Sequence, residues 1–107
     1  MKTQNWHIRQ GDVLVEKVDS IPDNVKPVER DKGRIILAYG EVTGHAHAIL
    51  TNAAEMLRAE NGERYLQVAE AAELIHEEHS TIQIPPGNYR VVQQREYSPE
   101  EIRNVAD

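Results

Sequence analysis

Hydrophobic and polar residues alternate in short runs along most of the chain, which is the period of β-strands. Residues 13–18 form a β-branched run that alternates at its end, and residues 81–84 alternate throughout. Residues 34–39 are almost continuously apolar, as expected for a strand buried on both faces. Further strands are predicted at residues 45–50, 65–68, 71–76 and 89–97.

Turn and loop residues separate these runs. Asn61-Gly62 is the strongest short-range hairpin pattern in the chain and lies between residues 53–59 and 65–68. The first of these arms has helix-forming composition, so a short helix is the alternative for it. Pro86-Gly87 fits the two central positions of a type II turn. Residues 19–32 contain two prolines and seven charged residues, and they are expected to form a loop.

The chain ends with a change of period. Ser98-Pro99-Glu100-Glu101 combines a capping box with proline at the first helical position, and it predicts a short helix ending near Ala106. Seven to nine short strands with turns at regular spacing indicate an all-β fold, a small antiparallel barrel or sandwich with this short C-terminal helix. Residues 1–107 have the length of a single domain.

Composition and charge exclude several classes of function. The chain has no cysteine, which excludes disulfides, thiolate metal ligands and a cysteine nucleophile. Its net charge is -6 without a stripe of Lys and Arg, so nucleic acid is not an expected partner. No apolar run reaches the ~18 residues of a membrane span, and a cytoplasmic location is expected. A small core leaves a slim folding margin, and a homodimer would add to it.

Candidate chemistry is concentrated in histidine. Four of the five histidines form two pairs, His45-Ala46-His47 and His76-Glu77-Glu78-His79. Alternate residues of a strand share a face, so His45 and His47 are expected to point the same way. Residues three apart in a straight strand point to opposite faces, so His76 is favoured as a third member of the site. His79 joins only if the segment turns between the two.

Neutral imidazoles without a thiolate suit a divalent metal ion such as Zn, Fe, Mn or Ni. Three or four protein ligands are needed, and His45, His47, His76 and His79 supply up to four. The alternative is that the same histidines line a recognition surface or hold loops by hydrogen bonds in a noncatalytic module. Either interpretation is compatible with a small-molecule ligand.

Two glutamates inside the second pair carry a further ambiguity. Glu77 and Glu78 are either solvated charges at the rim of the site, or one of them is a fourth ligand or a general base. The spacing matches neither HExxH nor HxxEH, which excludes the zinc-protease motifs. If the protein is an enzyme, the metal would act as a Lewis acid or activate water, with Glu77 or Glu78 as the base.

Several segments resemble those of a family of small, uncharacterised bacterial and phage-like β-rich proteins. They are GEVTGHAHAI at residues 40–49, HEEH at 76–79, IPPGNYRV at 84–91 and QREY at 94–97. The resemblance covers most of the chain, and it implies a β-rich fold without implying any catalytic residue.

The chain also resembles cupins in part. In these small β-barrels an HxH pair opens the first metal motif and a PxG turn lies in the second, and residues 45–47 and 85–87 are similar in type and order. Residues 50–52 contain no counterpart of the cupin glutamate, and Arg90 stands where the second motif has its histidine. A cupin-like site would therefore take its missing ligand from the second histidine pair.

Overall fold

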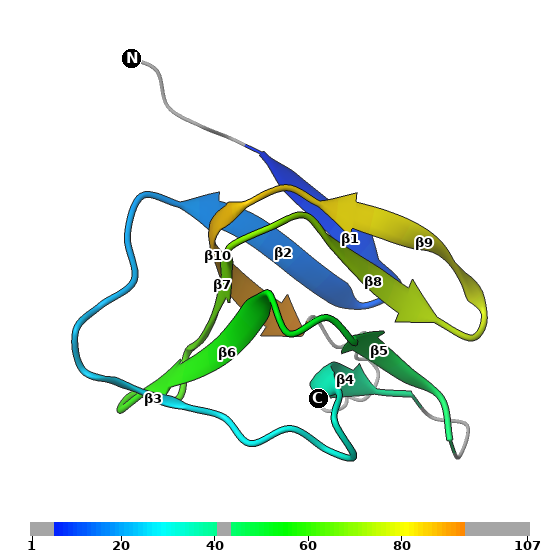
Figure 1. Cartoon of the computed structure of the whole chain (residues 1–107), viewed down its shortest axis with the longest axis horizontal. Coiled ribbons are helices and arrows are strands. Elements are labelled where there is room, and N and C mark those ends of the chain that lie inside the picture. Colours follow the sequence, from blue (N-terminus) through cyan, green and yellow to red (C-terminus); the bar gives the residue numbers. More distant parts are fainter. Residues whose placement is uncertain (1–5, 41–43, 94–107) are drawn as a thin grey trace, which may run out of the picture.

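The structure, a computed structural model, describes residues 6–40 and 44–93, and these residues form strands and connecting loops without a helix (Figure 1). The helix expected at residues 98–106 lies outside the described residues. The same described residues hold no helix that is long and apolar enough to cross a membrane. The strands are β1 (His7–Gln10), β2 (Val13–Val18), β3 (Val25–Pro27), β4 (Ile35–Tyr39), β5 (Ala46–Ile49), β6 (Ala54–Ala59), β7 (Arg64–Val68), β8 (Ala72–His76), β9 (His79–Ile84) and β10 (Gly87–Gln93).

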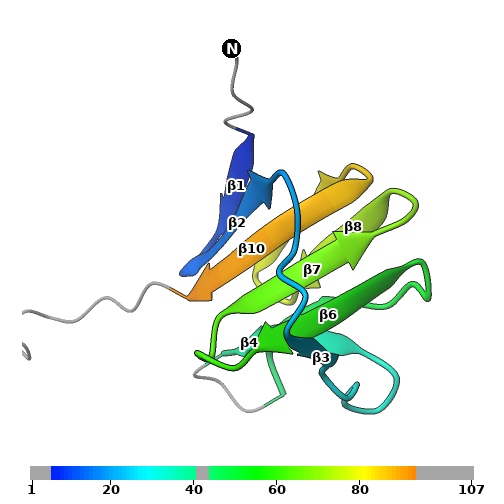
Figure 2. The same ribbon diagram turned by 90° about the vertical axis from the view of Figure 1, so that its left-hand side faces the viewer.

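The strands form two antiparallel sheets. One has six strands in the order β1-β2-β10-β7-β6-β3, and the other has four in the order β4-β5-β8-β9. Figure 2 shows the six-stranded sheet as a twisted fan with the second sheet packed behind it. The described residues form strands and no helix, so the all-β prediction is confirmed. Neither sheet closes on itself, so the architecture is a sandwich rather than a barrel.

Alternating side chains build the core between the sheets. Val13 and Val15 on β2 are fully buried, whereas Leu14 between them is only partly buried. The same alternation on β6, β7 and β8 directs one face of each strand inward. The core cluster consists of Val13, Val15, Ile35, Leu37, Ala38, Ile49, Ala54, Met56, Leu66, Val68, Ala72, Leu74, Ile84, Tyr89 and Val91.

The turn expectations had different outcomes. The hairpin at Asn61-Gly62 is confirmed, because β6 and β7 pair around it and Gly62 has a φ of 92°. The helical alternative for its first arm is wrong, since residues 54–58 pair with β7 and residues 57–59 pair with β3. The type II turn at Pro86-Gly87 is also wrong. Gly87 has a φ of 151° and already begins β10, because the proline segment crosses from one sheet to the other.

The loop expected at residues 19–32 is confirmed except for the three residues of β3, which pair with the edge of β6. Arg30 fastens the loop to the sandwich. Its guanidinium donates hydrogen bonds of 2.8 Å to the carbonyl of Thr51 and 3.0 Å to that of Ala54. These bonds keep the loop against the end of the sheets (Figure 1).

Candidate histidine site

Four imidazole rings meet where β5 approaches the hairpin of β8 and β9. The ring centroids of His47 and His76 are 4.3 Å apart, and those of His76 and His79 are 4.6 Å apart. His79 lies 5.7 Å from His47, and His45 lies 5.8 Å from His76. All four histidines singled out from the sequence therefore belong to one cluster.

The β8–β9 turn explains why both members of the second pair take part. Glu77 and Glu78 form the turn, and His76 and His79 are direct cross-strand partners on either side of it. Cross-strand partners lie on the same face of a sheet, whereas residues three apart in one straight strand do not. The sequence left the position of His79 open, and the turn resolves it.

His47 is the buried anchor of the cluster, with 3% of its surface exposed. Its Nδ1 lies 2.7 Å from Oε1 of Gln10. The Gln10 amide nitrogen donates to the carbonyls of Leu74 and Ser80, at 3.0 and 2.9 Å. Because that nitrogen must face these two carbonyls, the Gln10 oxygen faces His47 and accepts a hydrogen bond from Nδ1–H. Neutral His47 therefore carries its lone pair on Nε2.

Gln10 occupies an irregularity between β8 and β9. The register of these strands shifts between Leu74 and His76, and such an irregularity locally disrupts the ladder of backbone hydrogen bonds. The Gln10 side chain, itself 2% exposed, fills that position from the end of β1. One side chain thus joins the two sheets and orients the central histidine.

Burial, and secondly the charge of His76, lowers the pKa of His47 below its usual value. The carboxylate of Asp12 acts in the opposite direction but more weakly. His47 is therefore neutral near pH 7, and its Nε2 lone pair lies 3.5 Å from Oδ1 of Asp12. Gln93 holds the other oxygen of Asp12 with a hydrogen bond of 3.0 Å. Two electron-rich atoms thus face each other across a short gap.

Gly11 in the β1–β2 turn makes room for the rings. Its φ is 59°, and a Cβ placed on it would lie 3.0 Å from Nε2 of His79 and 3.2 Å from Cε1 of His47. Position 11 therefore requires glycine for two reasons: the backbone has a positive φ, and a side chain would collide with the rings of His47 and His79. The same turn carries Asp12, so one tight turn supplies a carboxylate and a recess for two imidazoles.

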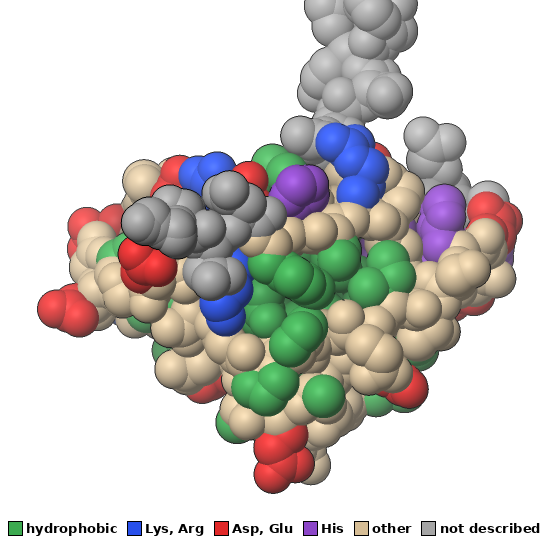
Figure 3. All heavy atoms as spheres, turned by 90° about the horizontal axis from the view of Figure 1, so that it is seen from above, with side chains coloured by type: hydrophobic (Ala, Val, Ile, Leu, Met, Phe, Trp, Pro, Cys, Tyr) green, Lys and Arg blue, Asp and Glu red, His purple; other side chains and the backbone are tan. Residues whose placement is uncertain are grey.

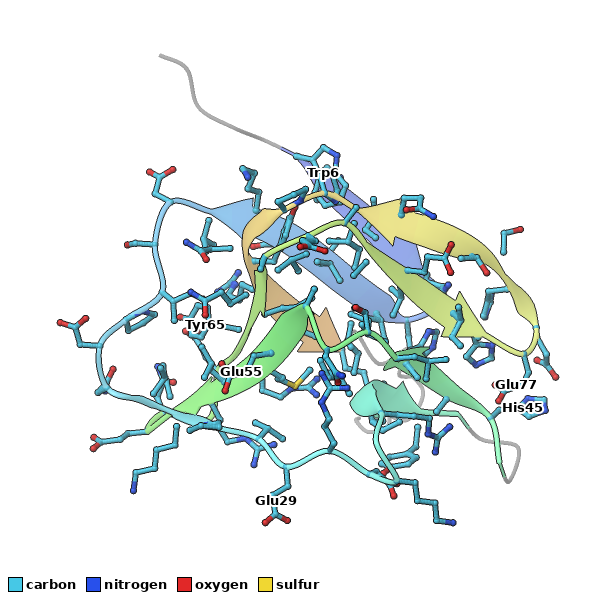
Figure 4. The ribbon with its side chains drawn as sticks, viewed as in Figure 1. Trp6, Glu29, His45, Glu55, Tyr65 and Glu77 are labelled. Carbon is cyan, nitrogen blue, oxygen red and sulfur yellow. The ribbon has the colours of Figure 1, made fainter. Side chains whose placement is uncertain are left out.

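The outer side of the cluster is more exposed. Oε1 of Glu77 accepts a 3.0 Å hydrogen bond from the Ala46 amide, which is the main cause that lowers the Glu77 pKa. Nδ1 of His45 is buried, has no hydrogen bond to any residue that the structure describes, and lies 3.4 Å from Oε2 of Glu78. Figure 4 shows His45 and Glu77 side by side at the end of the β8–β9 hairpin. In Figure 3, histidine side chains lie beside carboxylates at the margin of the molecule.

The side chains as they stand do not form a complete metal site. Among the described residues, no group of three or more His, Asp or Glu side chains has the arrangement needed to hold a metal ion. Nδ1 of His76 accepts a 3.0 Å hydrogen bond from the Glu78 amide, which leaves the proton of neutral His76 on Nε2. His76 and His79 would have to rotate to act as ligands together with His47.

Gln10, Gly11, Asp12 and Gln93 also belong to the site, although the sequence pattern did not predict them as site residues. No local spacing connects Gly11-Asp12 to a histidine on β5. These residues reach the cluster through the pairing of β1 with β2 and of β2 with β10.

A family model, Domain of unknown function (DUF8820), matches residues 9–94 and includes every residue of the cluster. The chain belongs to the DUF8820 family. Neither the curated proteins nor the solved structures include a match to this DUF8820 domain. The prediction that the chain belongs to a family without an assigned function is confirmed. Arg90, which stands where the second cupin motif has its histidine, forms ion pairs with Glu16 and Glu63 of the DUF8820 domain.

Proposed function

We propose that the DUF8820 domain binds a divalent transition metal ion at the histidine cluster. The observation that carries the proposal is the proton-free Nε2 of buried His47, which lies 3.5 Å from Oδ1 of Asp12. Two acceptors at this distance repel each other unless a cation lies between them. Two ligand atoms that are each ~2.1 Å from a tetrahedral ion lie ~3.4 Å apart, so the gap has the size that a metal ion requires.

Gln10 gives His47 the environment of a metal ligand. Ligating histidines usually donate their other ring N–H to a carbonyl or carboxylate, which fixes the tautomer and the ring orientation. Gln10 accepts this bond from Nδ1–H of His47 and is itself held by two carbonyls. The preorganised part of the proposed site is therefore His47 with Asp12.

His79 and His76 complete the proposed ligand set. Nε2 of His79 and Cε1 of His47 lie against the same side of Gly11, so these two rings already share one recess. His76 would ligate after its Nδ1 releases the Glu78 amide or its ring turns. Both histidines lie at the exposed end of a hairpin, where rotation is easy. A set of imidazole nitrogens and one carboxylate suits Zn, Fe, Mn or Ni.

A cupin-like catalytic role is the narrower form of this proposal. Of the two candidate bases, Glu78 is the better placed, because it lies beside His45 and is exposed. Glu77 is held by the Ala46 amide and its pKa is lowered, so it is a weaker base. Glu77 is better described as a residue that orients the start of β5.

Metal titration of the untagged protein tests the proposal. After treatment with a chelator, the protein should bind about one equivalent of Zn²⁺ or Co²⁺, and Co²⁺ should show the visible absorption of a four-coordinate site. His47→Ala and Asp12→Asn should each weaken binding by at least ~10-fold, whereas His7→Ala, outside the cluster, should leave it unchanged.

Two results would contradict metal binding. One is uptake below ~0.1 equivalent of every transition metal tested. The other is a His47→Ala variant that keeps full uptake but melts at a lower temperature, which would make the pair structural. Asp12→Asn changes a partly exposed side chain and should fold, so it keeps the test valid if His47→Ala does not fold.

A further inference from the structure

Three cations face one another on adjacent strands at the opposite end of the six-stranded sheet from β1. Lys26 on β3 is the direct partner of Arg58 on β6, and Arg58 is the direct partner of Arg64 on β7. Like charges at directly opposite positions destabilise a sheet. Within residues 6–40 and 44–93, no carboxylate forms an ion pair with any of the three. The arrangement lowers stability without an internal partner to compensate it.

Arg64 is the central member of this ladder and lies partly inside the sandwich. Its Nη1 donates a 2.8 Å hydrogen bond to the carbonyl of Leu37. Burial, and secondly the charge of Arg58, lowers the pKa of Arg64, but an arginine remains protonated at neutral pH. A guanidinium has five N–H donors, so most donors of Arg64 and all those of Arg58 remain unused by the residues that the structure describes.

Both arginines line a cavity of about 280 Å³ between β4, β6, β7 and the loop before β4. Its apolar wall includes Val28, Ile36 and Met56. This volume lies near the lower limit of small-molecule pockets, which start at ~300 Å³. The cavity combines two adjacent cations with an apolar wall, as a site for a small amphipathic anion does.

The acidic residues around the cavity do not neutralise the arginines. Asp31 accepts a hydrogen bond from the hydroxyl of Tyr39, so one of its carboxylate oxygens already has a partner. Glu29 also lines the cavity, but Figure 4 shows its side chain pointing away from the molecule. The positive charge of Arg58 and Arg64 therefore faces the cavity without a counterion from the described residues.

We propose that this cavity binds a small organic anion, with a carboxylate or phosphate head held by Arg58 and Arg64 and a short apolar tail against Met56. Guanidinium groups bind both kinds of head through paired, charge-assisted hydrogen bonds. An anion would also remove the repulsion between the two facing arginines. The cavity contains none of the four clustered histidines and the proposal does not depend on metal binding, although Gln93 both lines the cavity and holds Asp12.

Titration of chelator-treated protein with butyrate and with butyl phosphate, followed by amide NMR shifts, tests the proposal. At least one of the two should give saturable shifts confined to the residues that line the cavity, whereas neutral butanol should not. The tighter of the two probes identifies the head group. Arg58→Met and Arg64→Lys should each weaken binding by about 10-fold or more. Arg64→Lys keeps the charge but removes the paired donors.

Arg9→Met is the matched control, because it removes the same charge from β1 at the other edge of the sheet. It should leave the affinity for the anion unchanged. Shifts that grow linearly without saturation, or an equal loss in Arg9→Met, would overturn the proposal. If Arg64→Lys does not fold, Arg58→Met decides the question, since Arg58 is exposed and its removal leaves the core intact.

Discussion

Gln10→Met is expected to lower the free energy of unfolding strongly, although the two side chains are similar in size. Three polar groups lose a hydrogen bond at this position: the carbonyls of Leu74 and Ser80 and Nδ1–H of His47. An unsatisfied buried group costs about 1–3 kcal/mol. The hairpin end is partly exposed and can relax, so a total of about 3–5 kcal/mol is expected. That is a large share of the ~5–15 kcal/mol that stabilises a domain.

Urea unfolding at equilibrium, followed by circular dichroism in the presence of a chelator, measures this loss. Gln83→Met on β9 is the control, because Gln83 is exposed and donates one 3.0 Å hydrogen bond to Glu73. It should change the stability by less than ~0.5 kcal/mol. A Gln10→Met variant within ~1 kcal/mol of this control would refute the account of Gln10 as the residue that joins the sheets.

The remaining predictions concern the cluster and one turn. The folded-state pKa of His47 lies below its unfolded value of ~6.5, so protons bind the unfolded chain more readily. The metal-free protein should therefore lose stability as the pH falls below ~6.5. His47→Gln should make the free energy of unfolding, measured by urea titration, depend less steeply on pH; an unchanged dependence would contradict the lowered pKa of His47. Gly11→Ala should destabilise by ~1–3 kcal/mol in the same assay and weaken metal binding, because φ is 59° and the new methyl group would contact His79; full retention of both would be inconsistent with this packing. Lys32 has a φ of 56° and precedes Gly33 with a φ of 81°, the geometry of a type I′ turn. Lys32→Asn should therefore raise the melting temperature by a few degrees in a thermal scan, and a decrease would contradict this turn assignment.

Much of the local structure could be predicted because it depends on neighbouring residues. The period-2 pattern at residues 13–18 and 81–84 locates strands, and Asn61-Gly62 locates a hairpin, since side-chain alternation and turn chemistry act within a few residues. The histidine pairs likewise identified the four rings that meet. Type II geometry at Pro86-Gly87 was mispredicted, because the same residues also serve a crossing between two sheets.

The sequence by itself determined an all-β chain and a concentration of imidazoles, and only the tertiary structure decided how they are used. His79 enters the cluster through the pairing of β8 with β9, and Gln10 and Asp12 enter through the position of β1 and β2 beside them. The facing arginines likewise become neighbours only through the register of β6 and β7. Strand order and register are set by how the whole core packs, so contacts between residues far apart in the chain leave no local pattern to detect.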